Sequence, residues 1–251
     1  MLNHQLVELL KKLKLHGVAN SLKLNIDDVY TYKVNFEEAL IDAFTSELLV
    51  RNQKTIDRLI RCATLKYPHA RIDDVRFDTN RIGLTSQTVY RFSECTWIRE
   101  LKNLNILGPT GIGKTWLACA FATKACSEGY KTKFFKYAEF VDLIEQSICN
   151  SNEKLLIKRL MKFDLIVLDD FGLNHTPSGI ENILLDFIDS FSMHGSLLIT
   201  SQFSYDLWFE KFNDPTIADA ILDRIIHNSY TFEISGDSMR KINSSTEIAT
   251  F

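Results

Sequence analysis

The first third of the chain repeats apolar residues at the spacing of amphipathic helices. One face of a first helix is predicted from four leucines at i, i+3, i+4 and i+7: Leu6, Leu9, Leu10 and Leu13. Gly17 is predicted to mark the end of that helix. A second helix is expected over residues 36–63, before the breaker Tyr67-Pro68. We therefore expect residues 1–78 to form a small all-helical domain.

From about residue 80, short apolar runs alternate with helical stretches. The predicted strands are residues 104–107, 132–136, 165–168, 196–200 and 230–234. This alternation is typical of an α/β fold with a central parallel sheet, which we expect over residues 79–251. The polar stretch 71–79 is the predicted linker between the two domains.

Composition excludes several classes of protein. The 251 residues are 45% apolar and carry a net charge of only −3, so no global attraction to nucleic acid or membrane is expected. No segment has the length and apolarity of a membrane helix or of a signal peptide. The five cysteines include no C-x-x-C pair, and no cysteine and histidine have zinc-ligand spacing. We expect a cytoplasmic protein with no membrane partner and no structural metal.

Residues 108–115 read G-P-T-G-I-G-K-T, which matches the P-loop pattern G-x-x-x-x-G-K-[ST]. Its glycines let backbone N–H groups turn towards phosphate oxygens, and the following helix favours the anion. Lys114 is expected at the β- and γ-phosphates, with the Thr115 hydroxyl on magnesium. An incidental glycine-rich loop is the alternative, but the strand-like run before it favours ATP and Mg²⁺. The candidate ATP-binding residues are Gly108, Pro109, Thr110, Gly111, Ile112, Gly113, Lys114, Thr115 and Trp116.

A second apolar run, residues 165–168, ends in Asp169 and Asp170, which is the pattern of a Walker B strand. Ligands bind where the strands of such sheets end. Asp169 is expected to hold magnesium, and Asp170 to orient and deprotonate the attacking water. A solvated turn is the alternative for these carboxylates when they are considered alone.

Three further polar residues are candidates with open alternatives. Gln202, after the strand at 196–200, is expected near the γ-phosphate, although a plain turn explains it almost as well. Arg224 lies near the end of a predicted helix that starts at Pro215, and no acidic residue on that helix is well spaced to pair with it. Arg240 follows the last strand, where a solvated tail is the alternative.

With these motifs, the chain resembles the IstB-type helper ATPases of insertion-sequence transposons, relatives of the DnaC helicase loaders in the AAA+ class. The matching segments occur in the family's order and extend over almost the whole chain. They are residues 13–17, 97–98, 108–115, 168–172, 200–202, 214–224 and 236–241. The string D-P-T-I-A-D-A-I-L-D-R at 214–224 is the most family-specific of them.

The resemblance implies roles that spacing alone does not assign. Arg224 resembles the arginine finger that reaches into the ATP site of a neighbouring subunit, so it implies a homo-oligomer. Arg240 resembles the sensor-2 arginine, which implies that it binds ATP from the C-terminal side, and Gln202 resembles the sensor-1 residue. The chain has Asp170 where most AAA+ proteins have Glu, and too few residues follow Arg240 for a full C-terminal lid.

On the second predicted helix, Arg51, Lys54, Arg58 and Arg61 share one face, which could lie along a DNA backbone. A solvated face is the alternative, supported by Glu47 and Asp57 four residues before two of these arginines. The resemblance implies DNA binding and contact with a transposase.

The preferred functional hypothesis is a DNA-dependent AAA+ ATPase that oligomerises on duplex DNA and helps a transposase select its target. A DnaC-like helicase loader is the alternative with the same core. An ATP-gated DNA-binding scaffold with little turnover is a third hypothesis, left open by Asp170. A small-molecule kinase is disfavoured, because no second substrate pocket is legible and two late arginines fit an oligomeric ATPase better.

Overall fold

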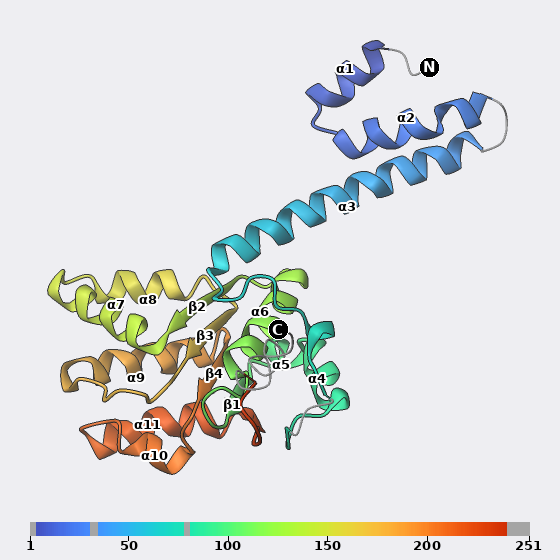
Figure 1. Cartoon of the computed structure of the whole chain (residues 1–251). Coiled ribbons are helices and arrows are strands. Elements are labelled where there is room, and N and C mark those ends of the chain that lie inside the picture. Colours follow the sequence, from blue (N-terminus) through green and yellow to red (C-terminus); the bar gives the residue numbers. More distant parts are fainter. Residues whose placement is uncertain (1–3, 31–34, 78–80, 240–251) are drawn as a thin grey trace, which may run out of the picture. The chain divides into compact units, whose positions relative to one another are not determined.

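The computed structural model describes residues 4–30, 35–77 and 81–239, and contacts divide the chain into two compact units. One unit is Met1–Arg58 and the other is Leu59–Phe251 (Figure 1). Neither unit has, among its described helices, one that is long and apolar enough to cross a membrane.

The first unit contains helices α1 (His4–Lys12) and α2 (His16–Tyr30) and most of α3 (Phe36–Ala63). The prediction that Gly17 ends the first helix is wrong, because the chain turns earlier, at Lys14, whose φ is 58°. Gly17 instead lies in the first turn of α2. A Cβ at this position would lie 2.6 Å from the Cα of Glu47, so glycine permits the close approach of α2 to α3.

Glu47 holds this approach together from α3. Its carboxylate accepts a hydrogen bond from the Gly17 N–H (2.6 Å) and another from Nε of Arg51 (2.8 Å). The bond from Arg51 lowers the pKa of Glu47, with smaller effects from the backbone N–H groups of Gly17 and Val18. Glu47 therefore caps the start of α2, where anionic groups are stabilising.

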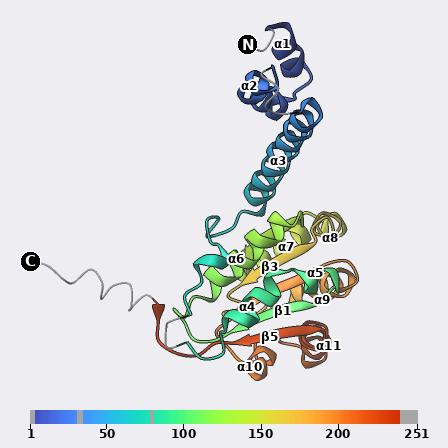
Figure 2. The same ribbon diagram turned by 90° about the vertical axis from the view of Figure 1, so that its right-hand side faces the viewer.

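The second unit is built on a five-stranded sheet in which every strand is parallel to its neighbours. Its strands are β1 (Asn103–Leu107), β2 (Thr132–Lys136), β3 (Leu165–Asp169), β4 (Ser196–Ser201) and β5 (Ser229–Glu233). They lie in the order β2-β3-β4-β1-β5. Figure 1 labels β2, β3, β4 and β1, and Figure 2 labels β3, β1 and β5. β3 and β1 are thus separated by β4, so the ends of three central strands lie side by side.

Helices cover both faces of this sheet. They are α4 (Ser86–Ser93), α5 (Thr96–Arg99), α6 (Lys114–Ser127), α7 (Tyr137–Cys149), α8 (Glu153–Leu160), α9 (Ser178–Ser192), α10 (Tyr205–Phe209) and α11 (Pro215–Ile226). Alternate residues of β3 enter different cores: Leu165 and Val167 pack with α4, α5 and α6, whereas Ile166 and Leu168 pack with α7 to α11. Burial on both faces explains the uninterrupted apolar run. The predicted α/β fold with a parallel sheet and helical N-terminal region is confirmed.

The segment between α3 and α4 belongs to the core of the second unit. Ala63, Leu65 and Ala70 are buried in the same cluster as α6. So are Ile72, the first residue of the short 3₁₀ helix η1 (Ile72–Asp74), and Val75, which follows that helix. The expected linker at 71–79 thus differs from the structure over residues 72–75, because two apolar residues among the polar ones are enough to anchor it. Contacts place the border between units at Arg58 and Leu59, twenty residues before the expected border at 78 and 79.

Candidate nucleotide-binding site

The P-loop joins β1 to α6 and is shaped by its glycines. Gly108 and Gly111 have φ values of 150° and 86°, which favour glycine. A Cβ would collide with the carbonyl oxygen of Ile234 at Gly108 and with the side chain of Ser238 at Gly111. The N–H of Met239 donates to the Gly111 carbonyl (2.9 Å). The chain after β5 therefore packs directly on the loop.

Lys114 is the first residue of α6 and is buried within the loop. Its ammonium donates to the carbonyls of Gly108 (2.7 Å) and Pro109 (3.0 Å). Burial lowers the pKa of Lys114, and the carboxylates of Asp170 and Asp169 oppose that effect. The two carbonyls are neutral acceptors. A negatively charged phosphate oxygen would bind the same ammonium more strongly.

Asp169 ends β3 beside the start of α6, as the Walker B prediction requires. Its Oδ1 accepts hydrogen bonds from the hydroxyls of Thr115 (2.8 Å) and Thr200 (2.6 Å). Its Oδ2 is buried and has no partner among the described residues. Burial raises the pKa of Asp169, while the two threonine hydroxyls lower it. A buried carboxylate oxygen without a partner, next to a hydroxyl, is suited to a hard cation.

Magnesium fits this donor pair, since it prefers oxygen ligands and keeps waters and substrate phosphates around it. The described residues contain no group of three or more His, Cys, Asp or Glu side chains that could hold a metal by themselves. Thr115 and Asp169 would therefore hold magnesium together with the phosphates of a bound nucleotide.

Asp170 and Gln202 lie at the ends of neighbouring strands and line the same cavity. Asp170 has a φ of 60°, and its N–H donates to the Thr200 hydroxyl (3.1 Å). Such a left-handed conformation is uncommon outside glycine, and Asp tolerates it better than most residues. The Gln202 carboxamide oxygen accepts a hydrogen bond from the Thr110 hydroxyl of the P-loop. The structure thus brings together all three strand-end groups that the sequence singled out.

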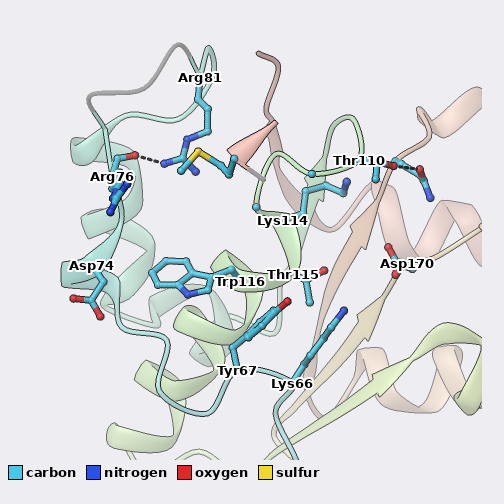
Figure 3. A pocket seen from close by; sticks show the side chains of 14 residues that line it. Lys66, Tyr67, Asp74, Arg76, Arg81, Thr110, Lys114, Thr115, Trp116 and Asp170 are labelled. Carbon is cyan, nitrogen blue, oxygen red and sulfur yellow. Dashed lines mark hydrogen bonds between the residues drawn. The ribbon is translucent and has the colours of Figure 1, made fainter. Parts of the chain in front are cut away.

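The cavity in front of these groups has a volume of about 490 Å³, within the usual range for small-molecule sites (Figure 3). Thr110, Lys114, Thr115 and Asp170 lie on one side of it, and Trp116 lies beside Thr115. Several lining residues were missed by the sequence reasoning: Lys66, Tyr67, Asp74, Arg76, Arg81 and Met239. They come from segments before β1 and after β5, and no local motif marks them. Thr200 was missed as a partner of Asp169, although its place at the end of a predicted strand was a usable signal.

Arg224 lies on α11, and it is not among the described residues that line this cavity. Its Nε donates to Asp189 on α9 (2.6 Å) and its Nη1 to the Ala220 carbonyl (2.9 Å). The sequence predicts no well-spaced acidic partner for Arg224 on its own helix, and its ion-pair partner indeed lies on another helix, α9. The pairing residue comes from a segment 35 positions away.

The start of α11 is held by two carboxylates. Asp214 caps the helix by accepting from the N–H groups of Thr216 (2.8 Å) and Ile217 (3.2 Å), with Pro215 as its first residue. The buried carboxylate of Glu181, on α9, accepts from the Asn213 N–H (2.6 Å) and its side-chain amide (2.9 Å). These contacts explain why the D-P-T string begins with residues that cap and start a helix.

The remaining candidates are less informative. Arg240 lies outside the described residues. Arg51, Lys54, Arg58 and Arg61 are all exposed on α3. Arg51 forms the predicted ion pair with Glu47 (2.8 Å), but that carboxylate is a buried helix cap and not part of a solvated face.

Comparison with known proteins shows relatives that are named for ATP binding. The family described as "IstB-like ATP binding protein" matches residues 8–247. A Sinorhizobium fredii protein, y4uH, named as an ATP-binding protein of an insertion sequence, is 34% identical over 250 residues, covering 100% of both chains. A Bacillus thuringiensis protein named for the insertion sequence IS232 and for ATP binding is 28% identical over 239 residues, covering 94% of each chain.

Solved structures of replication proteins share the fold. The crystal structure of the DnaC helicase loader superposes with a TM-score of 0.57 at 19% identity, covering 67% of this chain and 98% of that one. The crystal structure of DnaI gives a TM-score of 0.57 at 18% identity, covering 71% and 93%. Matched along almost its whole length and carrying the P-loop and Walker B geometry described above, this chain belongs to the family of IstB-like ATP-binding proteins of insertion sequences.

Proposed function

We propose that this chain hydrolyses ATP with magnesium, assembles on duplex DNA through ATP sites shared between subunits, and helps a transposase select its target. The contact of Asp169 with the Thr115 hydroxyl supports the hydrolytic part most directly, because it joins the P-loop to the Walker B strand. The insertion-sequence names of the relatives support the transposase as partner.

The residues of the cavity have distinct tasks in this proposal. Lys114 exchanges its two loop carbonyls for the β- and γ-phosphates. Thr115 and Asp169 hold magnesium, which neutralises phosphate charge when it is bound. Asp170 accepts the proton of the attacking water, and Gln202 orients that water from the adjacent strand.

ATP turnover with and without duplex DNA tests this chemistry. Asp170→Asn should reduce the rate about 10²-fold or more, because it removes the base. An exposed residue of α9 outside the cavity supplies the control, Asp186→Asn, which should turn over like wild type. If wild type hydrolyses ATP no faster than Asp170→Asn, an ATP-gated scaffold explains the protein better.

The shared site rests on Arg224, which lies outside its own subunit's cavity and is about one-third exposed. An arginine supplied in trans can stabilise charge on the transferred phosphate by several orders of magnitude in rate. Arg224→Ala and Lys114→Ala should each be inactive alone. Their mixture should recover part of the activity, because the intact arginine of one subunit meets the intact P-loop of the other. No recovery, in a mixture that still co-assembles, would refute the trans assignment.

Duplex DNA is proposed to bind the exposed basic face of α3. Replacing Lys54 and Arg58 with Ala should weaken binding and reduce the slope of log affinity against log salt by about 0.9 for each phosphate that is no longer neutralised. An exposed pair on α8, Lys158 and Arg159, provides a control of equal charge. An unchanged slope would place the DNA elsewhere.

A helicase loader remains the second candidate, since DnaC and DnaI share the fold. The two functions differ in the protein that the full chain binds. Co-purification with the transposase of the same element supports the first function. Binding to a replicative helicase, with no transposase complex, would favour the loader.

A further inference from the structure

A short segment after α3 supplies a second lysine to the nucleotide cavity. Lys66 and Tyr67 both line it, although they precede the P-loop by more than forty residues. In Figure 3 the two side chains rise side by side from below Thr115, while Lys114 lies above it. Lys66 extends towards Asp170.

The segment is held in place by its neighbours in the second unit. Ala63 and Leu65 are buried in the core beside α6, and Ala70 closes the other end. The backbone N–H groups of Tyr67 and Lys66 face the thiol of Cys119 on α6. Burial raises the pKa of that thiol to about 11, and these N–H groups partly oppose the rise. Leu65 is buried in the core, whereas the next side chain, Lys66, is exposed and lines the cavity.

The ammonium of Lys66 is not committed to a carboxylate. Among the described residues, no Asp or Glu oxygen forms an ion pair with it, and its Nζ lies over the Tyr67 ring, 5.7 Å from the ring centre. Its charge nevertheless reaches the Walker B strand. Burial raises the pKa of Asp169 and Lys66 is among the groups that lower it. The exposed ammonium of Lys66 therefore lies in the same cavity as Asp170 and interacts electrostatically with Asp169.

In the proposed site, Mg²⁺ and Lys114 together carry less positive charge than the phosphates of a nucleoside triphosphate carry negative charge. The terminal phosphate carries the largest share of the triphosphate's charge and lies farthest from the nucleobase. It is therefore the phosphate group nearest to Asp170 in a P-loop site. We propose that Lys66 binds the terminal phosphate of the bound nucleoside triphosphate, as a second lysine of this site. Since Lys66 follows the last residue of α3 by three positions, this contact also ties that helix end to the presence of the γ-phosphate.

The inference rests on the nucleotide binding in the proposed function, but not on hydrolysis, DNA or a transposase. Calorimetric titration of the full chain with Mg²⁺ and either ADP or a non-hydrolysable ATP analogue tests it. Lys66→Ala should weaken the triphosphate about threefold to tenfold, as expected for one charged contact, and ADP less than twofold. Lys66→Arg should bind the triphosphate like wild type, and the control Lys158→Ala should bind both nucleotides like wild type.

Three outcomes would overturn the inference. The first two are equal losses of affinity for both nucleotides, and no loss for either. A third outcome would show that Lys66 acts only by screening the negative charge of Asp170. If Lys66 only offsets that charge, the loss of triphosphate affinity should vanish when Lys66→Ala is combined with Asp170→Asn; if it binds phosphate, the loss persists. Should wild type bind neither nucleotide, the proposed function fails as well, whereas wild-type binding with an unaffected Lys66→Ala overturns the lysine contact alone.

Discussion

Asp169 shows how a binding site places a cost on the folded protein. Its side chain is fully buried, and Oδ2 has no partner among the described residues. An unsatisfied buried oxygen costs about 1–3 kcal/mol, more when it is charged. In the proposed function the same oxygen would bind magnesium, which would offset that cost.

Asp169→Asn should therefore stabilise the nucleotide-free protein while removing its response to Mg²⁺ and ATP. We expect a Tm higher by about 2–4 °C for each kcal/mol gained. The raised pKa means that the folded state binds the Asp169 proton more tightly than the unfolded state does. The cost of burying the charged Asp169 carboxylate is thus fully present when the pH is above the pKa of Asp169 in the folded state. It disappears when the pH falls below the pKa of Asp169 in the unfolded state. The advantage of the Asn variant, measured by thermal unfolding, should be largest at neutral pH and shrink as the solution is acidified. A lower Tm for the variant at pH 7 would contradict this interpretation.

Helices α2 and α3 are joined by a contact that depends on a missing side chain. Gly17 lets the backbone of α2 approach Glu47, whose carboxylate then accepts the Gly17 N–H (2.6 Å). The contact explains why residue 17 is a glycine and why an acidic residue is buried on α3.

Gly17→Ala should destabilise the first unit by about 1–3 kcal/mol, because the new methyl group overlaps the α3 backbone. Urea unfolding followed by circular dichroism measures the change. The control is Gly179→Ala on α9, where an added Cβ meets no atom within 4 Å, so its stability should be unchanged or higher. Equal behaviour of the two variants would show that α2 shifts without cost.

At the scale of the whole molecule, the proposed shared site requires a rearrangement. Arg224 is bound to Asp189 of its own subunit (2.6 Å), so it must leave that carboxylate to reach a neighbour's phosphate. An exposed ion pair of this kind is worth about 0.2–1 kcal/mol, which makes it a weak restraint.

Asp189→Asn should accordingly ease assembly. The protein concentration that gives half-maximal ATP turnover should fall about 1.5-fold to fivefold, in proportion to the energy of the ion pair that the variant removes. Turnover measured over a dilution series provides the test, with Asp186→Asn on the same helix as control. A higher half-maximal concentration would mean that Asp189 positions Arg224 for its partner.

Local patterns predicted the strands and the P-loop well. The run at 165–168 became β3, one residue longer, and Asp169 and Asp170 stand at its end as expected. Prediction failed where a residue's meaning depends on a distant one. The local pattern around Gly17 predicts a helix end, but a glycine is needed there because the backbone of Glu47, thirty positions away, approaches it closely. Arg224 was judged against its own helix, whereas its partner is on α9.

The sequence by itself determined the parallel α/β core, the phosphate loop and the Walker carboxylates. Each is encoded within a few consecutive residues, because a doubly buried strand needs an unbroken apolar run and a phosphate needs contiguous N–H groups. Only the tertiary structure decided that Thr200 holds Asp169 and that Lys66 lines the cavity with Lys114. Those relations depend on strand order and on the packing of the segment after α3. Strand order and packing are determined by the whole core, and no single segment of the sequence determines them.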